Sequence, residues 1–102
     1  MPELLDAEVV ADQLRANAHW RGDSSAILRS ARLPDFRTAI SAVDDIADAA
    51  EALDHHPDID IRYDTLHFEL STHSAGGVTD LDFELARAID IVLAALNAQD
   101  ID

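Results

Sequence analysis

Four of the five histidines lie close together in the sequence, between positions 55 and 73. Imidazole is the side chain best suited to move protons near neutral pH, so such a cluster favours general acid–base chemistry. His55 and His56 are adjacent and are followed by Pro57, while His73 stands further along the chain. These three histidines are the candidate catalytic residues if the fold brings them together.

A helix is expected to position the first two histidines. Apolar residues from Phe36 to Leu53 recur at steps of three and four, which is typical of one helix face. Asp35 is the expected N-cap, and Pro57 ends the helix because the residue before a proline is pushed out of the helical region. His55 and His56 are therefore expected at its C-terminal end.

Two strands are expected after this helix. Apolar and polar residues alternate over 59–63 and again over 66–70, a pattern typical of half-buried strands. A two-residue turn at Asp64-Thr65 would put all six apolar side chains on one face. Carried outward, that register places His56 opposite His73, and the hairpin would then make neighbours of two distant histidines.

The rest of the chain completes an alternating order of elements. A first helix is expected over Asp6–Ala18, with Asp6 as its N-cap, and a weak strand or strand pair over Ala26–Leu33. Thr79 and Asp82 form a capping-box pattern that begins a last helix, expected to reach about Gln99. The predicted order is helix, two strands, helix, two strands, helix.

The composition narrows the classes of function. The 102 residues are expected to form one domain spanning 1–102. Seven arginines and no lysine stand against 21 acidic residues, a net charge of −14. This charge excludes ordinary binding to the nucleic-acid backbone and disfavours anionic membranes. We attribute the charge to a solubilising surface.

Cysteine is absent, which excludes disulfides, thiolate catalysis and cysteine-based metal sites. The sequence opens without a basic region followed by an apolar run, and no segment has the roughly 18 consecutive apolar residues of a membrane span. We therefore expect a cytoplasmic protein with no membrane partner.

Each histidine, taken singly, fits a structural role as well as acid–base catalysis. His55 could cap its helix, His67 could be an exposed strand residue, and His73 could hydrogen-bond within a loop. Metal binding is the competing chemical role, since three imidazoles and a carboxylate can hold zinc. It is disfavoured because adjacent histidines rarely bind one ion and no His-x-His or His-Glu-x-x-His spacing occurs.

Two further patterns are weaker candidates for chemistry. Ser71 and Ser74 lie near His73, but no nucleophile-elbow pattern surrounds them. Gly76-Gly77 could suggest a phosphate-binding loop, but no glycine-rich loop with a lysine is present. A tight chain reversal before the last helix is the simpler role for these glycines.

The spacing of these residues resembles the signature of the pterin-4a-carbinolamine dehydratase family. The similarity covers residues 51–90. It rests on EALDHHP at 51–57, Tyr63, THSAGGVT at 72–79, Asp82 and ELARAID at 84–90. A match at so many spaced points is far more specific than a single short motif.

The resemblance implies an α+β fold with helices on one face of a four-stranded antiparallel sheet, in the order α-β-β-α-β-β-α. It implies a dehydratase that converts a 4a-hydroxytetrahydropterin to quinonoid dihydropterin and water, in tetrahydrobiopterin recycling, with no metal or organic cofactor. His55, His56 and His73 would form the active centre, and Asp82 and Glu51 would bind substrate. The resemblance also implies a homodimer or homotetramer.

We hypothesise that His55 and His73 are the acid–base pair and that His56 orients the substrate. The spacing leaves open which of the two donates the proton. The alternative is a non-catalytic dimerisation or assembly module of the same fold, because some relatives act in that way. The three histidines favour chemistry, since an assembly role does not need them.

Overall fold

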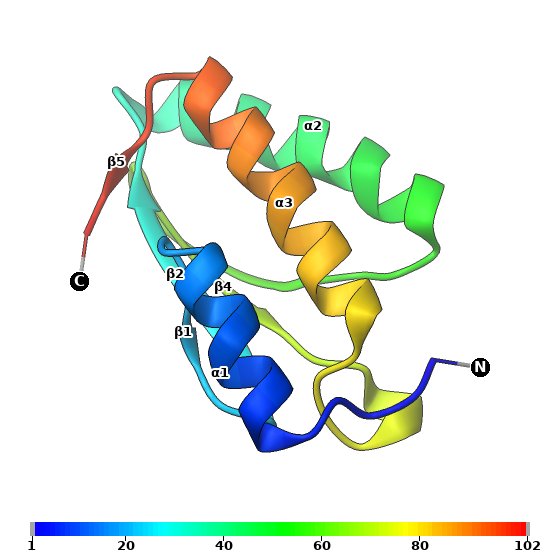
Figure 1. Ribbon diagram of the computed structural model, residues 1–102. Helices are drawn as coiled ribbons and strands as arrows, with labels where there is room; N and C mark the ends of the chain where they lie inside the picture. Colours follow the sequence, from blue (N-terminus) through cyan, green and yellow to red (C-terminus); the bar gives the residue numbers. More distant parts are fainter. Residues whose placement is uncertain (1, 102) are drawn as a thin grey trace.

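The computed structural model describes residues 2–101, which form three α-helices, one short 3-10 helix and five strands. The helices are α1 (Ala7–Ala16), α2 (Phe36–Leu53), η1 (His73–Ala75) and α3 (Asp80–Ala95). The strands are β1 (Arg21–Gly22), β2 (Ile27–Arg32), β3 (Asp58–Arg62), β4 (Thr65–Leu70) and β5 (Gln99–Asp100). Figure 1 follows this order from blue to red.

The strands form one antiparallel sheet in the order β1-β2-β4-β3, and the α-helices pack on one of its faces (Figure 1). The alternation of β4 explains this arrangement, because Leu66, Phe68 and Leu70 are all buried in the main apolar core. The α+β class and the order of elements are therefore confirmed. No helix within residues 2–101 is long and apolar enough to cross a membrane.

Local capping interactions fix where the helices begin, as the sequence predicts. Asp6 accepts a hydrogen bond from the backbone of α1, and Asp35 does the same for α2. At the start of α3, Thr79 and Asp82 form the complete capping box. Each cap satisfies backbone N–H groups that the first helical turn leaves without partners.

The end of the chain differs from the prediction. The last helix ends at Ala95 rather than near Gln99, because Asn97 takes a left-handed conformation with φ of 63°. Residues Gln99–Asp100 then form β5, which pairs with Ala31 and Arg32 of β2. This strand was not predicted from the sequence.

The register predicted for the hairpin is wrong by two residues. Arg62 pairs with Thr65, so the turn consists of Tyr63 and Asp64. Thr65 is β-branched, poorly suited to a turn, and stays in the strand, while exposed Tyr63 takes a left-handed φ of 56°. A shift of two keeps the same faces buried. The expected pairing of His56 with His73 across the hairpin is lost.

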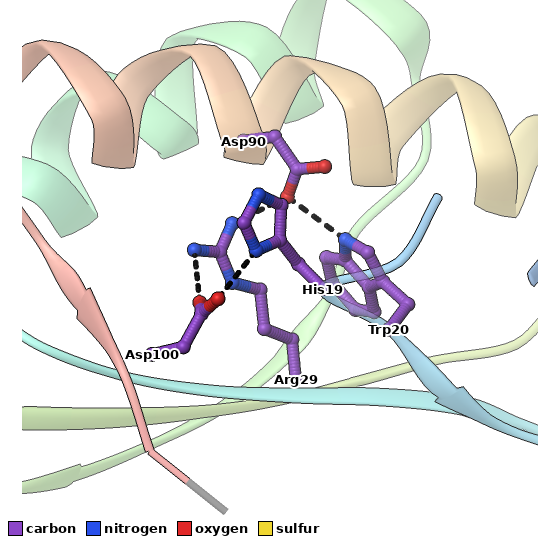
Figure 2. A network of polar contacts seen from close by, with 5 residues as sticks. All are labelled: His19, Trp20, Arg29, Asp90 and Asp100. Carbon is purple, nitrogen blue, oxygen red and sulfur yellow. Dashed lines mark hydrogen bonds and ion pairs between the residues drawn. The ribbon is translucent and has the colours of Figure 1, made fainter. Parts of the chain in front are cut away.

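A buried arginine joins the sheet to α3 and to the C-terminal strand (Figure 2). Arg29 of β2 is 4% exposed, and its guanidinium donates to Oδ1 of Asp90 at 2.5 Å and to Oδ1 of Asp100 at 2.8 Å. Trp20 also donates to Asp90, at 2.8 Å, and His19 lies 2.6 Å from Asp100. The network links β2 to α3 and β5, two elements that are distant from it in the sequence.

Candidate functional site

A cleft of about 390 Å³ opens between the end of α2, the start of β3 and the segment after β4. Three of the five histidines line it, and no arginine does. The lining residues are Asp54, His55, His56, Pro57, Asp58, Ser71, Thr72, His73 and Ser74. The structure therefore brings the three candidate histidines to one cavity, although not through the predicted strand register.

The end of α2 directs the two adjacent histidines differently. Asp54 follows the helix in a left-handed conformation, with φ of 49° and ψ of 44°, and its N–H is bonded to carbonyls of the last turn. Pro57 prevents the helix from continuing. After this reversal His55 is buried against the fold, while His56 is exposed.

His55 is held from behind by a carboxylate. Its Nε2 lies 2.6 Å from Oδ1 of Asp82, which is fully buried in the first turn of α3. Asp82 does not line the cleft. The residue expected to bind substrate therefore reaches the cleft through His55.

The other oxygen of Asp82, Oδ2, also accepts hydrogen bonds. Oδ2 accepts hydrogen bonds from the hydroxyl of Thr72 and from the backbone N–H of Thr79, each at 2.9 Å. The two threonine hydroxyls lie 2.7 Å apart. All three residues are buried, so this network holds the carboxylate in one orientation.

His56 has a separate, exposed carboxylate partner. Its Nε2 lies 2.5 Å from Oε2 of Glu51, one turn earlier on α2, and both side chains are more than half exposed. Glu51 does not line the histidine cleft. The pair orients His56 at the rim, and solvent weakens the attraction between the two side chains.

His73 approaches from the other side of the cleft. It begins η1, and its side chain is exposed, with no hydrogen bond to any other residue within 2–101. The loop closes because the N–H of Thr72 bonds to the carbonyl of Gly77 at 2.8 Å. Position 77 requires glycine, since a Cβ there would lie 2.6 Å from the carbonyl oxygen of Ser24.

The arrangement can exchange protons with a bound molecule at more than one point. One imidazole is buried and held by a carboxylate, and two are exposed on the same cleft. Because imidazole can donate or accept near neutral pH, such a group of side chains is suited to acid–base catalysis. Within residues 2–101, no three His, Asp or Glu side chains are placed to hold a metal ion.

Three polar residues of the site were not predicted from the sequence. Asp54 and Asp58 line the cleft with exposed carboxylates, and Thr72 joins the Asp82 network. Asp54 and Asp58 could have been predicted, because they lie within two positions of His55 or His56 in the sequence. Nothing in the local pattern indicates that the Thr72 hydroxyl contacts Asp82, because that contact depends on how the loop folds over α3.

Comparisons with known proteins agree on one family. The family model for pterin 4 alpha carbinolamine dehydratase matches residues 3–92. A relative from Chloroflexus aurantiacus is 47% identical over 93 residues, 91% of this chain and 99% of its own. One from Nocardia farcinica is 49% identical over 88 residues, 86% and 93% of the two chains. Both carry provisional names as pterin-4-alpha-carbinolamine dehydratases.

A solved structure shows the same fold. The crystal structure described as transcriptional coactivator/pterin dehydratase from Brucella melitensis superposes with a TM-score of 0.83 and 37% identity. The match covers 86% of this chain and 96% of that one. The resemblance inferred from the spacing of residues 51–90 is thus confirmed over most of the chain. By family model, relatives and fold, the chain belongs to the pterin-4a-carbinolamine dehydratase family.

Proposed function

We propose that this protein dehydrates a pterin-4a-carbinolamine to the quinonoid dihydropterin by histidine general acid–base catalysis, as a step in tetrahydrobiopterin recycling. The observation that carries the proposal is the meeting of His55, His56 and His73 at one cleft in a member of this family. We infer that the chain acts as a single domain, since its buried apolar residues form one cluster.

The proposed reaction moves protons and leaves oxidation states unchanged. The bond between C4a and its hydroxyl oxygen breaks, and that oxygen takes a proton and leaves as water. The neighbouring N5 loses its proton as the double bond between N5 and C4a forms. One group must therefore donate a proton and another must accept one, which paired imidazoles can do. The step needs no redox cofactor.

The geometry supports distinct roles for the three histidines. His55 follows α2 and His73 begins η1, so the two imidazoles reach the cleft from different elements and can act at different atoms of one substrate. His56, held by Glu51 at the rim, would orient the pterin. Asp82 acts through His55 and is therefore a positioning residue in this proposal.

The cleft also fits a small, neutral ring system. Its volume of about 390 Å³ lies in the range of roughly 300–1,000 Å³ typical of small-molecule sites. The carboxylates of Asp54 and Asp58 can accept hydrogen bonds from the amino and N–H groups of a pterin. No arginine lines the cleft, so it offers no permanent positive charge to an anionic substrate.

We propose that the protein self-associates through the edge of β3. This strand ends the sheet, and an open edge can pair with another chain. Ile61 is 40% exposed and Tyr63 is 71% exposed beside it. An apolar groove between α2 and Ile59 continues the surface. Light scattering is expected to show a dimer or tetramer rather than a monomer.

The alternative, a non-catalytic binding or assembly module, is favoured by one observation. The Brucella protein is described as a transcriptional coactivator as well as a pterin dehydratase. A ligand of the native state must raise the melting temperature. At 100 times its Kd, a reduced pterin contributes about 2.7 kcal/mol, equal to roughly 12 °C in Tm for a domain of this size. No shift at saturating pterin would favour the module.

The catalytic proposal is tested by assaying the purified protein with a 4a-carbinolamine and following the appearance of quinonoid dihydropterin. We expect dehydration well above the rate without protein. A rate equal to that background, together with an unchanged Tm in reduced pterin, would contradict the proposal.

A further inference from the structure

We propose that Thr72 is a positioning residue: its hydroxyl fixes the Asp82 carboxylate so that His55 carries its hydrogen on Nε2 and presents an unprotonated Nδ1 to the cleft. The inference rests on the proposed function for its kinetic consequence, but the tautomer of His55 can be measured independently. It assigns a role to a hydroxyl that lies between the cleft and the buried network.

The direction of the hydrogen bonds follows from the donors available. The backbone N–H of Leu81 donates to the hydroxyl oxygen of Thr79 at 3.3 Å. Thr72 donates its only hydroxyl hydrogen to Oδ2 of Asp82, so the bond between the two threonine hydroxyls must run from Thr79 to Thr72. In this series of hydrogen bonds, from Leu81 through Thr79 and Thr72, each donor therefore points toward Asp82.

The Asp82 carboxylate, at the end of this series of hydrogen bonds, acts as an acceptor. Its Oδ2 already receives two hydrogens, from the Thr72 hydroxyl and the Thr79 backbone. A carboxylate is an acceptor-only group, and this pattern of donors fits one. Oδ1 of Asp82 then requires a donor at 2.6 Å, which is the Nε2–H group of His55.

The remaining nitrogen of His55 is open to the cleft. Within residues 2–101, the only buried side-chain nitrogen or oxygen without a hydrogen-bond partner is Nε of Arg29. Nδ1 of His55 has no partner among these residues, so it must be accessible to solvent. Because His55 lines the cleft, its Nδ1 is the atom that a bound pterin can meet.

This tautomer gives His55 a defined task. Neutral His55 accepts a proton at Nδ1, and Asp82 stabilises the imidazolium that forms. In the proposed dehydration that proton comes from N5 as the N5 to C4a double bond forms, and the departing hydroxyl takes a proton from His73. Solvent then returns one proton to His73 and removes one from His55, so the cycle balances.

Thr72→Val tests the role of the hydroxyl with little change of shape. Valine leaves Oδ2 of Asp82 with one donor and leaves the Thr79 hydroxyl without its acceptor. The carboxylate can then turn, and the preference of His55 for one tautomer weakens. Thr72→Ser keeps the hydroxyl and serves as the conservative variant. Thr65→Val is the matched control, because Thr65 is also buried but bonds only to Asp64 at the far end of β4.

The first measurement is the tautomer itself, from long-range proton–nitrogen NMR correlations of protein labelled with ¹⁵N-histidine, at alkaline pH where imidazoles are neutral. His55→Gln assigns the signals by their loss. The wild type is expected to show hydrogen on Nε2 and none on Nδ1 of His55. A wild type with hydrogen on Nδ1 would overturn the inference without need of any variant.

The second measurement is the dehydration rate of the same proteins, with circular dichroism as the check on folding. We expect Thr72→Val to show a mixture of tautomers and a kcat lowered about tenfold with KM within about twofold. Thr72→Ser and Thr65→Val are expected to stay within about twofold of wild type. A folded Thr72→Val protein with wild-type tautomer and kcat would refute the role of Thr72. An inactive wild type whose His55 tautomer still depends on Thr72 would instead refute the proposed function and leave the inference standing.

Discussion

Nε2 of His55 lies 2.6 Å from Oδ1 of Asp82, although the two residues are 27 positions apart in the sequence. The contact joins the end of α2 to the start of α3, and Asp82 has a second task there as the acid of the capping box. One carboxylate thus stabilises a helix and orients a histidine at the cleft. Substitution of Asp82 should therefore affect stability and activity together.

Asp82→Asn is expected to lower kcat about 100-fold, because the amide cannot stabilise a charged His55 as the carboxylate does. It should also cost about 1–3 kcal/mol in the free energy of unfolding, since the amide keeps only one of the two acceptor oxygens that serve the buried donors. Asp80→Asn, an exposed change in the same helical turn, is the control. Paired assays and denaturant titrations of both variants test this. Equal kcat values for the two variants would contradict the role given to Asp82.

The two loop glycines should respond differently to alanine. Gly76 has a left-handed φ of 82° and open space around it, so Gly76→Ala should cost about 1–2 kcal/mol of backbone strain. Gly77→Ala would place a Cβ 2.6 Å from the carbonyl oxygen of Ser24, so the backbone must move. We expect Gly77→Ala to give the lower Tm and the greater loss of dehydration, because the displaced segment carries His73. The reverse order in thermal melts would contradict this account of the loop.

Replacement of buried Arg29 should lower the free energy of unfolding far more than replacement of exposed Arg32, three positions further along β2. Arg29→Met leaves the carboxylates of Asp90 and Asp100 without their shared cation. We expect a cost of about 3 kcal/mol, at the lower end for a broken buried pair because both carboxylates are partly exposed. Arg32→Met, which loses an exposed contact of 3.8 Å to Asp64, should cost less than about 1 kcal/mol. Urea unfolding compares the two, and similar midpoints would count against the network.

The C-terminal strand should show a pH-dependent contribution to stability. Partial burial acts to raise the pKa of Asp100, but hydrogen bonds and charge from His19 and Arg29 outweigh it, so the pKa is lowered. Folding therefore favours the ionised carboxylate, and its contribution is present above about pH 4 and is lost as the pH falls through the lower folded pKa. We expect wild type to exceed Asp100→Asn in stability at neutral pH, with the difference narrowing in acid. A difference that widens as the pH falls would contradict this sign.

The helices and their caps could be predicted from sequence because their signals are local. The periodic apolar residues of Phe36–Leu53, with Asp35 before and Pro57 after, define α2 within a few positions, and Thr79 and Asp82 mark the start of α3. The position of His55 and His56 at the end of α2 was predicted for the same reason.

The hairpin register and the last strand could not be predicted in this way. Alternation repeats every two residues, so a shift by two leaves every side chain on its face, and the choice of Tyr63-Asp64 as the turn depends on backbone conformation. Strand β5 has only two residues and no pattern of its own. It is held by the contact of Asp100 with Arg29, and the contact of Asp82 with Thr72 is likewise fixed by tertiary folding.

Whether the histidine cleft dehydrates pterin carbinolamines is decided by the dehydration rate of wild type beside His55→Ala, His73→Ala and His67→Ala. His67 lies on β4, outside the cleft, and controls for the loss of an imidazole elsewhere. We expect the first two variants to lose about 100-fold or more in kcat, and His67→Ala to keep the wild-type rate. Full activity in both His55→Ala and His73→Ala would rule out acid–base catalysis by these histidines.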